Sequence, residues 1–410
     1  MAAVAAPSHS EGEHSRGVED GEVAFAALEG SPAPTTADGS VDPKTLIFRE
    51  ASLAEKHLCW ARNSGSWSAP LKSITDYIGR ETLNGSQTMT RNGKIRYWVL
   101  VDPKASGHVY AAVETLQKEV MVKTKAGGYT EEIGHGIASV FTDPVIRKRG
   151  IATVLMQKLG EWLDREGGGR FSALYSDIGK VWYAQRGWRT FPSQQMQINF
   201  EAATGSVPAD APAEGEGSGA TPLYLEDMEA LCERDTEVLR HSIRDEPLAD
   251  GVDARFSFAP SFAQASWHFA TVEYIARIHL GKDQIPRVKG AHAGNCWMYW
   301  THDFRERELN VLRIVTLGGL RDGDSSEAGI SEALALIMAR AVAEAKQWAL
   351  HGVIVWAPSE QLVAVTKSLP GVQVTVGERT EGSIPCLRWK GCDIEGKNVD
   401  WEANEKFAWC

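Results

Sequence analysis

The sequence predicts an α/β protein in which a mixed, mostly antiparallel sheet flanked by helices is formed twice. In the amino-terminal half, a run of segments rich in Val, Tyr and Phe is followed by the order helix, strand, helix. A polar segment at 202–221 then interrupts the apolar pattern, and a similar order of elements returns after it. The repeated order favours an internal structural duplication.

The elements of the first half follow from apolar spacing and from the glycines between them. Ile151, Leu155, Leu159 and Trp162 recur at helical spacing, and a Gly-Gly-Gly break at 167–169 ends that helix. We expect helices at 51–60, 71–80, 151–164 and 180–186, and strands at 45–49, 96–102, 109–122, 137–141 and 171–176.

The second half shows the same types of segment. Periodic apolar residues predict helices at 223–241, 262–280, 328–350 and 360–369. Runs of apolar and β-branched residues predict strands at 296–300, 309–316, 353–356, 372–376 and 384–389.

Composition divides the chain into four parts. Val207 is the only sizeable apolar residue in 202–221, so this segment cannot bury enough surface to order itself. Residues 1–40 carry many acidic residues against a single arginine, Arg16. We therefore expect a disordered acidic tail at 1–40, a first domain at 41–201, a flexible linker at 202–221 and a second domain at 222–410.

Charge and cysteine usage exclude several classes of protein. The net charge of −11 repels a nucleic-acid backbone, and no stretch approaches the roughly 20 apolar residues that span a bilayer. The six cysteines are scattered without a C-x-x-C pair, which is typical of reduced cytoplasmic thiols and predicts no metal site. We expect a cytoplasmic protein, with its oligomeric state open.

One segment has the pattern of a phosphate-binding turn. A strand ending at Thr142 leads into the basic residues Arg147, Lys148 and Arg149, and Gly150 opens an amphipathic helix. A helix amino terminus exposes unpaired N–H groups and partial positive charge, and small residues let the backbone approach a pyrophosphate. The alternative is an ordinary strand-to-helix turn with solvated basic side chains.

These residues resemble the GNAT acetyltransferase superfamily. Arg147, Gly150 and Ala152 fit its R/Q-x-x-G-x-G/A motif, and Tyr183 with Gly187-Trp188 is similar to its Tyr-x-x-x-Gly-aromatic motif. A closer resemblance is to the fungal lysine N6-acetyltransferase family, on the phrases at 139–144 and 174–179.

The resemblance implies acetyl-CoA as the acetyl donor, held against the strand 140–142 with its pyrophosphate on the basic turn. At the position where the family often has asparagine, seven residues before the tyrosine, this sequence has Ser176. The implied cofactor-binding residues are Val140, Phe141, Thr142, Arg147, Lys148, Arg149, Gly150, Ile151, Ala152 and Ser176.

Acetylation of an amine needs a base and an acid. A lysine amine has a pKa of about 10.4, so reaching the neutral form at pH 7 costs about 4.6 kcal/mol and a base must take the proton. Glu132, His135 and Glu114 are the candidate bases, since they precede or neighbour the cofactor strand. By the resemblance, Tyr183 is the candidate acid for the departing thiolate, the alternative being a core tyrosine.

The second half offers a candidate acceptor wall. Trp297 and Tyr299, in the run Trp-Met-Tyr-Trp, could line a substrate pocket between the domains, or could belong to a buried strand. Leu317-Gly-Gly-Leu320 stands where a repeat would carry its phosphate turn but lacks the basic motif. We expect a degenerate second domain that binds no cofactor.

The leading hypothesis is therefore an N-acetyltransferase that moves an acetyl group from acetyl-CoA to the side-chain amine of free L-lysine or a similar small amine, by direct attack. The alternatives are acetylation of a secondary metabolite or a protein lysine, and a noncatalytic acyl-CoA-binding protein. The acidic net charge favours a cationic substrate but does not separate these acceptors.

Overall fold

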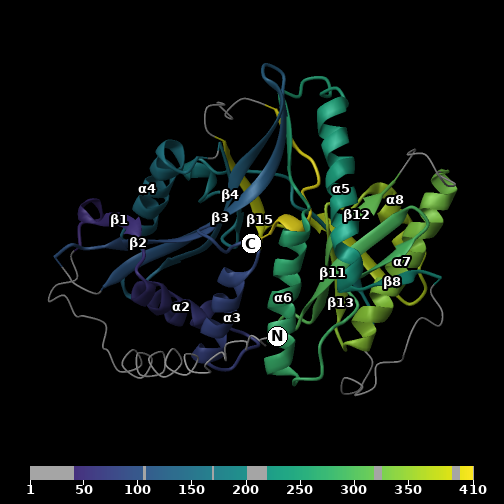
Figure 1. Ribbon diagram of the computed structural model, residues 1–410, viewed down its shortest axis with the longest axis horizontal. Coiled ribbons are helices and arrows are strands. Elements are labelled where there is room, and N and C mark those ends of the chain that lie inside the picture. The colour runs from purple at the N-terminus through teal and green to yellow at the C-terminus, as the bar shows by residue number, and fades with distance from the viewer. Residues whose placement is uncertain are drawn as a thin grey trace, which may run out of the picture.

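The computed structural model describes residues 41–104, 108–168, 170–200, 219–317, 326–389 and 398–409. The predicted tail, most of the predicted linker and residues 318–320 of the second-half loop lie outside these ranges. The described chain folds into two sheets with helices packed on them, which confirms the α/β prediction (Figure 1).

The first sheet has the strand order β1-β2-β3-β4-β5-β15-β6. Along this path β4 and β5 are parallel and all other neighbours are antiparallel. β9 pairs with the far part of β3, and β16 pairs with β9. The strands are β1 (Ile47–Glu50), β2 (Ile95–Val101), β3 (Val109–Thr124), β4 (Gly128–Thr142), β5 (Phe171–Ser176), β6 (Arg189–Thr190), β9 (Ala254–Phe258), β15 (Ile384–Trp389) and β16 (Val399–Trp401).

The second sheet repeats this pairing scheme in the order β8-β10-β11-β12-β13-β7-β14. Here β12 and β13 are the parallel pair, in the positions of β4 and β5, and all other neighbours are antiparallel. The expected second, similar domain is thus confirmed at the level of topology. Its strands are β7 (Gln194–Asn199), β8 (Thr221–Leu223), β10 (Gly290–Ala293), β11 (Cys296–Asp303), β12 (Glu308–Thr316), β13 (Gly352–Trp356) and β14 (Gln373–Glu378).

Each half of the chain contributes strands to the other half's sheet: the second sheet contains β7, and the first sheet contains β9, β15 and β16. β7 precedes the 202–221 segment in sequence, yet it lies between β13 and β14, with Met196 opposite Val355 and Val376. β15 comes from the carboxy-terminal half and lies between β5 and β6, with Leu387 opposite Ala173 and Arg189 (Figure 1). The predicted domain boundaries stay a prediction, but strand pairing crosses them in both directions.

Serine side chains begin most of the helices. Ser52, Ser73, Ser261, Ser326 and Ser359 each accept a hydrogen bond from a first-turn N–H, for α2, α3, α6, α7 and α8 in turn. The helices are α2 (Leu53–Trp67), α3 (Ile74–Ser86), α4 (Ile151–Arg165), α5 (Leu225–Asp245), α6 (Phe262–His279), α7 (Glu327–Gln347) and α8 (Glu360–Lys367). Among the described residues, no helix combines the length and apolar character that crossing a membrane requires.

Two details of the secondary-structure prediction need correction. The helix expected over 180–186 is only the single 3₁₀ turn η3 (Ala184–Arg186), which ends at Gly187 with φ of 92°. The strand expected over 137–141 is the carboxyl end of the much longer β4, whose first part is polar because it extends beyond the core. Three further short 3₁₀ turns are η1 (Pro43–Thr45), η2 (Pro144–Ile146) and η4 (Lys406–Ala408).

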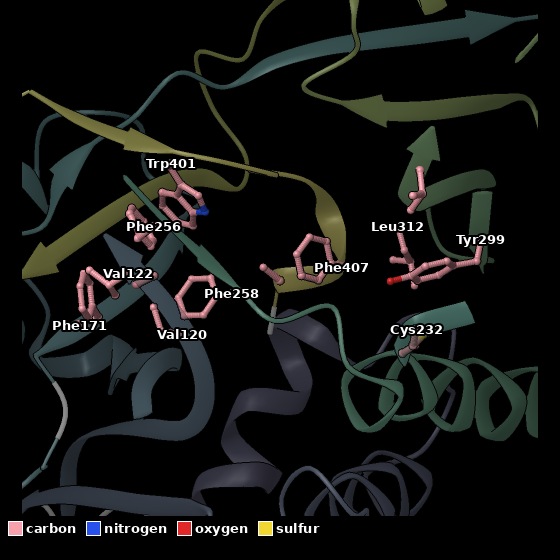
Figure 2. Close-up of a cluster of buried hydrophobic side chains, with 14 of the residues drawn as sticks. Val120, Val122, Phe171, Cys232, Phe256, Phe258, Tyr299, Leu312, Trp401 and Phe407 are labelled. Carbon is pink, nitrogen blue, oxygen red and sulfur yellow. The ribbon is translucent and has the colours of Figure 1, made fainter. Parts of the chain in front are cut away.

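A single apolar core joins the two halves. Phe171 and Val120 of the first sheet pack in one cluster with Phe256, Trp401 and Tyr299, which come from beyond residue 222 (Figure 2). Phe171 and Phe256 stack with ring centroids 5.5 Å apart, and Phe256 and Trp401 are 5.0 Å apart. The two halves therefore share this cluster, while two further clusters lie mainly within one half each.

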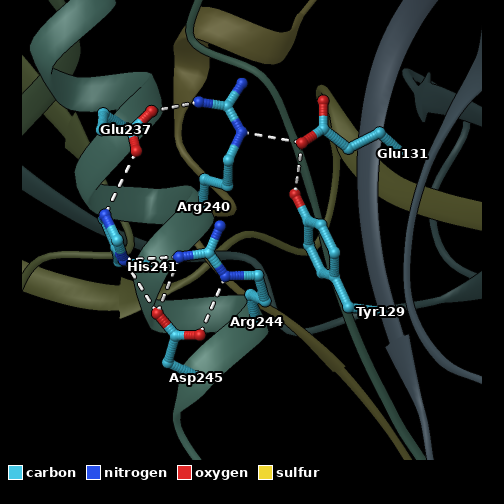
Figure 3. Close-up of polar contacts among 7 residues, drawn as sticks. All are labelled: Tyr129, Glu131, Glu237, Arg240, His241, Arg244 and Asp245. Carbon is cyan, nitrogen blue, oxygen red and sulfur yellow. Dashed lines mark hydrogen bonds and ion pairs between the residues drawn. The ribbon is translucent and has the colours of Figure 1, made fainter.

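A surface network ties the β3–β4 hairpin to α5. Arg240 of α5 donates from Nε to Glu131 of β4 at 2.7 Å, and Tyr129 donates to the same carboxylate at 2.6 Å (Figure 3). Along the helix, His241, Arg244 and Asp245 continue the network. Exposed pairs contribute little stability individually, so this network orients the hairpin more than it stabilises it.

The strand exchange predicts that the halves depend on each other for folding. If a protease site is placed within 202–218 and cut, we expect the two pieces to coelute in size-exclusion chromatography and to unfold in one transition, because β7 and β15 stay in the partner's sheet. Either piece expressed alone should give no cooperative unfolding transition. Separation of the cut pieces in native buffer, each with its own transition, would contradict this interdependence.

Candidate active site

The first sheet opens between β4 and β5, the parallel neighbours of its main path. The β4–β5 pairing covers three residue pairs and ends at Ile137 opposite Leu174, although β4 continues to Thr142 and β5 to Ser176. A β-bulge lies where the strands part: Ser139 and Val140 together oppose one residue of β3, and Ser139 has a φ of 52°. The bulge turns β4 away from β5 and leaves a V-shaped gap.

The predicted phosphate turn follows the open end of β4. Gly150 adopts the left-handed conformation with φ of 83° and caps α4 without a side-chain hydrogen bond, unlike the serine-capped helices. Arg147, Lys148 and Arg149 are exposed, and Arg147 Nε donates to the Thr142 carbonyl at 3.1 Å. The first-turn N–H groups therefore have no side-chain cap and are flanked by positive charge, which fits a pyrophosphate.

Exposed apolar side chains border the same opening. Val145 after β4, and Ile178 and Val181 after β5, are 76%, 60% and 64% exposed. Exposure of these side chains to water is unfavourable, and a bound molecule with an apolar arm would bury them.

A cleft of about 920 Å³ runs from this opening to the second half of the chain. Its first-half wall includes Glu114, Ser139, Val140, Tyr175 and Tyr183. Its opposite wall comes from α6, the β11–β12 hairpin, β13 and the carboxy-terminal segment, and includes Thr271, Asp303, Glu308, Trp356, Arg379 and Lys406.

Tyr183, the candidate acid, lines the cleft. Its carbonyl accepts from Arg186 N at 2.9 Å and Trp188 N at 3.1 Å, and the Arg186 guanidinium is anchored on Thr153 of α4. These contacts fix the tyrosine relative to the phosphate turn. Burial raises the pKa of the Tyr183 phenol above its usual value, which keeps it protonated.

Ser176 serves its own turn. Its hydroxyl donates to the Gly179 carbonyl at 2.7 Å and accepts from Ile178 N at 3.3 Å. The side chain thus stabilises the turn after β5, and it does not line the cleft.

Glu114 is the candidate base that the structure brings to the cleft. It lies on β3 opposite the bulge and accepts a hydrogen bond from Trp60 Nε1 at 3.4 Å. Burial, followed by the nearby Glu81 carboxylate, raises the pKa of Glu114 to about 8, although hydrogen bonds from Trp60 and Ser139 act in the opposite direction. Such a carboxyl is mostly protonated at neutral pH, and its deprotonated fraction is a stronger base than an ordinary carboxylate.

Glu132 and His135 lie elsewhere. The Glu132 carboxylate is paired with Arg170, and this contact lowers its pKa. His135 is buried against Trp162, with ring centroids 5.8 Å apart, and burial lowers its pKa to about 4. Neither side chain lines the cleft.

Trp297 and Tyr299 are also away from the cleft. Both are buried on β11 in the core that joins the halves, at 3% and 1% exposure. The cleft is lined by the far end of the same strand, Thr301 to Asp303, and by Trp356 of β13. A bulge between Tyr299 and Trp300 separates these two parts of β11, and sequence periodicity gave no sign of it.

The second sheet has an equivalent opening that the chain itself fills. β12 and β13 part after Val311 opposite Val355. Beyond that point Glu405 of the carboxy-terminal segment accepts from Ile314 N at 2.9 Å and pairs with Arg313, which also binds Asp235 at 2.8 Å. The expected lack of a second cofactor site stays a prediction, with this filled opening as its structural argument.

Comparison with known proteins identifies similar chains. The family described as the LYC1 GNAT-like C-terminal domain matches residues 204–410. A lysine acetyltransferase from Yarrowia lipolytica (strain CLIB 122 / E 150) is 22% identical over 393 residues, covering 84% of this chain and 94% of its own length.

Solved structures of similar shape include a conserved protein from Enterococcus faecalis V583 described as a probable N-acyltransferase. It has a TM-score of 0.48 at 10% identity and covers 84% of this chain and 72% of its own. A GCN5-related N-acetyltransferase from Kribbella flavida has a TM-score of 0.46 at 17% identity, covering 85% and 72%.

The raised pKa of Glu114 predicts a pH-dependent cost in stability. The folded chain holds this proton up to about pH 8, whereas the unfolded chain releases it near pH 4.5, so the free energy of unfolding falls as pH rises between these values. Glu114→Gln should leave the unfolding temperature unchanged at pH 4.5 and raise it by more than about 2 °C at pH 8.5. Differential scanning calorimetry measures both.

Glu119→Gln is the matched control, because Glu119 is an exposed carboxylate on the same strand. It should shift the unfolding temperature equally little at both pH values. If Glu114→Gln and Glu119→Gln behave alike, the Glu114 carboxyl is not held neutral by the fold.

Proposed function

Because the chain belongs to the LYC1 GNAT-like family and is an acetyl-CoA-dependent acetyltransferase, we propose that it acetylates the side-chain amine of free lysine or a similar small amine by direct attack. The relative from Yarrowia lipolytica, a lysine acetyltransferase, supports this choice of acceptor. The observation that carries the proposal is the single cleft that holds Glu114 and Tyr183 together with the open end of β4.

The donor would bind at the opening of the first sheet. The N–H groups of the α4 amino terminus and the basic side chains at 147–149 hold the pyrophosphate, and the residues 140–142 run along the pantetheine arm. Acetyl-CoA supplies an acetyl group as a reactive thioester. A backbone N–H of the separated β4 edge polarises its carbonyl.

The amine reaches the thioester in its neutral form. The deprotonated form of Glu114, a minor fraction at pH 7, takes the proton of the ammonium directly or through one water, and its pKa of about 8 makes it a stronger base than an ordinary carboxylate. The amine then forms the C–N bond while the C–S bond breaks. Tyr183 gives its proton to the departing sulfur, and the second proton that the new amide nitrogen loses returns to Tyr183 through solvent.

The charge of the cleft favours a cationic acceptor. Acidic side chains outnumber Lys and Arg along its walls even without Glu114, whose raised pKa keeps it mostly uncharged at pH 7. Such a field attracts an ammonium group. The acidic lining residues are Glu81, Glu114, Asp177, Asp303, Glu306, Glu308 and Glu381, and the basic ones are Arg80, Arg305, Arg379 and Lys406.

The experiment that tests the proposal follows release of free thiol from acetyl-CoA with lysine, ornithine, polyamines, an amino sugar and a lysine-containing peptide. We expect turnover with lysine and the formation of one acetylated amine per thiol. If only the peptide is turned over, the substrate is a protein lysine and not a small amine. If acetyl-CoA binds but no amine causes thiol release, the proposed catalytic activity is wrong.

Gly150→Asp should abolish acetyl-CoA binding. The substitution places a negative charge at the amino terminus of α4, where it opposes the pyrophosphate. Gly150→Asn is the matched control, because asparagine has the same shape and tolerates the left-handed backbone. Calorimetric titration should give at least about tenfold weaker binding for Asp than for Asn, and equal affinities would remove the phosphate turn from the proposed site.

Tyr183→Phe should slow acetyl transfer by about 10²-fold, because it removes the proposed proton donor, and should leave acetyl-CoA affinity nearly unchanged. Rapid-mixing measurement of a single turnover isolates this step. Tyr129→Phe removes the same atom from the surface network and should leave the rate unaltered. A Tyr183→Phe rate equal to that of the unsubstituted protein would return this tyrosine to a packing role.

A further inference from the structure

We propose that Arg379 and Lys406 form a carboxylate-binding subsite in the cleft, so that the preferred acceptor is a free amino acid with an amine at its far end. This inference rests on the proposed function and deepens it. It assigns a role to two cations that the acetyl-transfer chemistry does not use.

Both cations are held against one buried aromatic ring. The Arg379 guanidinium lies 3.9 Å from the ring centroid of Trp356, and Lys406 Nζ lies 4.8 Å from it. Trp356 belongs to β13 and is 3% exposed. Arg379 follows β14 and Lys406 begins η4, so three separate segments of the chain converge to place these charges in the cleft.

These cations differ from the other basic residues of the cleft in lacking a carboxylate. Arg80 is paired with Glu81, and Arg305 is paired with Glu306 at 3.0 Å. Within the described part of the chain, neither Arg379 nor Lys406 has a carboxylate oxygen within 4.0 Å. Neither cation is therefore neutralised by a carboxylate in direct contact.

The hydrogen-bonding capacity of the pair is also incompletely used. Arg379 donates from Nη2 to the Ser383 carbonyl at 3.1 Å, whereas Nε and Nη1 are buried without a partner among the described residues. Lys406 Nζ donates to Asn310 Oδ1 at 2.9 Å. Unpaired buried donors are costly, and a ligand carboxylate would pair with one of them, either Nε or Nη1, together with the remaining N–H of Nη2.

Burial lowers the pKa of Arg379 to about 10 and that of Lys406 to about 8. A bound anion beside either group would oppose this shift, so anion binding and the charge of the pair favour each other. The other buried arginine of this half, Arg313, shows the contrast, because two carboxylates already surround it.

The subsite is connected to the proposed base across the cleft. Trp356 contacts Tyr175, with ring centroids 5.8 Å apart, and Tyr175 follows Leu174 where β5 parts from β4. Glu114 lies on β3, on the other side of β4. Glu114 and the two cations line the same cleft, so the proposed acceptor extends between them, with its carboxylate at Arg379 and Lys406 and its terminal amine toward Glu114.

Acidic side chains next to the subsite suit the remaining group of an α-amino acid. Asp303 and Glu308 both line the cleft and act electrostatically on Lys406. The α-ammonium group of the bound amino acid would lie beside Asp303 and Glu308, while its α-carboxylate binds Arg379 and Lys406. A lysine within a protein chain carries neither a free α-carboxylate nor an α-ammonium group, so this subsite would discriminate against it.

The test compares substrates with and without a carboxylate, for the unsubstituted protein and for a variant that lacks the Arg379 guanidinium. Cadaverine is lysine without its carboxylate, and 6-aminohexanoate is lysine without its α-amine. For the unsubstituted protein we expect kcat/KM to be about 10- to 100-fold higher for lysine than for cadaverine. Arg379→Gln should remove most of this ratio by lowering the value for lysine, while the cadaverine value changes by less than about threefold.

Arg305→Gln is the control variant, because Arg305 is a cleft arginine with a carboxylate partner. It should affect lysine and cadaverine alike. Lys406→Met should reduce the lysine preference in the same direction as Arg379→Gln. Acetyl-CoA affinity should be unchanged in both subsite variants, since a loss there would assign the two cations to the donor.

A measurement on the unsubstituted protein covers the case in which these variants fail to fold. Norleucine keeps the α-carboxylate and lacks the side-chain amine, so it should inhibit competitively against lysine, whereas pentylamine should inhibit much more weakly. Equal inhibition by both, or equal turnover of lysine and cadaverine, overturns the subsite but leaves the acetyltransferase proposal standing. Absence of turnover with every amine overturns both.

Discussion

The reciprocal exchange of β7 and β15 is the constraint on which the rest of the structure depends. Each strand completes a sheet whose other main strands come from the opposite half of the chain. Arg388 of β15 adds a further contact with the first half, because its guanidinium donates two hydrogen bonds to Asp164 of α4, at 2.5 and 2.7 Å. Because a sheet needs its interior strands to satisfy backbone hydrogen bonds, the exchange fixes the halves against each other. The cleft between them follows from that fixed placement.

The same topology occurs twice, but the two openings between parallel strands differ. In the first sheet the opening borders the cleft and ends at a glycine-capped helix. In the second sheet Glu405 fills the opening and satisfies Ile314 N and Arg313. Removing either donor would leave a largely buried carboxylate without a partner, so these contacts keep Glu405 in the opening.

The carboxy-terminal segment links that scaffold to the cleft. Its Phe407 carbonyl contacts His268 of α6 at 3.0 Å, and its Ala408 carbonyl accepts from Lys118 of β3. These contacts hold Lys406 and Trp409 at the cleft wall. The segment therefore contributes both to the core that joins the halves and to the surface that faces a substrate. Burial on the opposite wall favours the uncharged form of the Glu114 carboxyl. A pKa raised in this way is typical of carboxyls at functional sites.

The sequence by itself determined the features that depend on neighbouring residues. The glycine-capped turn before α4, the tyrosine at 183 and the bounds of β5 and β15 could all be predicted, because helix caps, turns and apolar runs are local. Only the tertiary structure decided which distant strands pair and which side chains face the cleft. It selected Glu114 over Glu132 and His135, placed Trp297 and Tyr299 in the core, and brought Arg379 to Lys406, because these relations arise from nonlocal burial that no periodicity encodes.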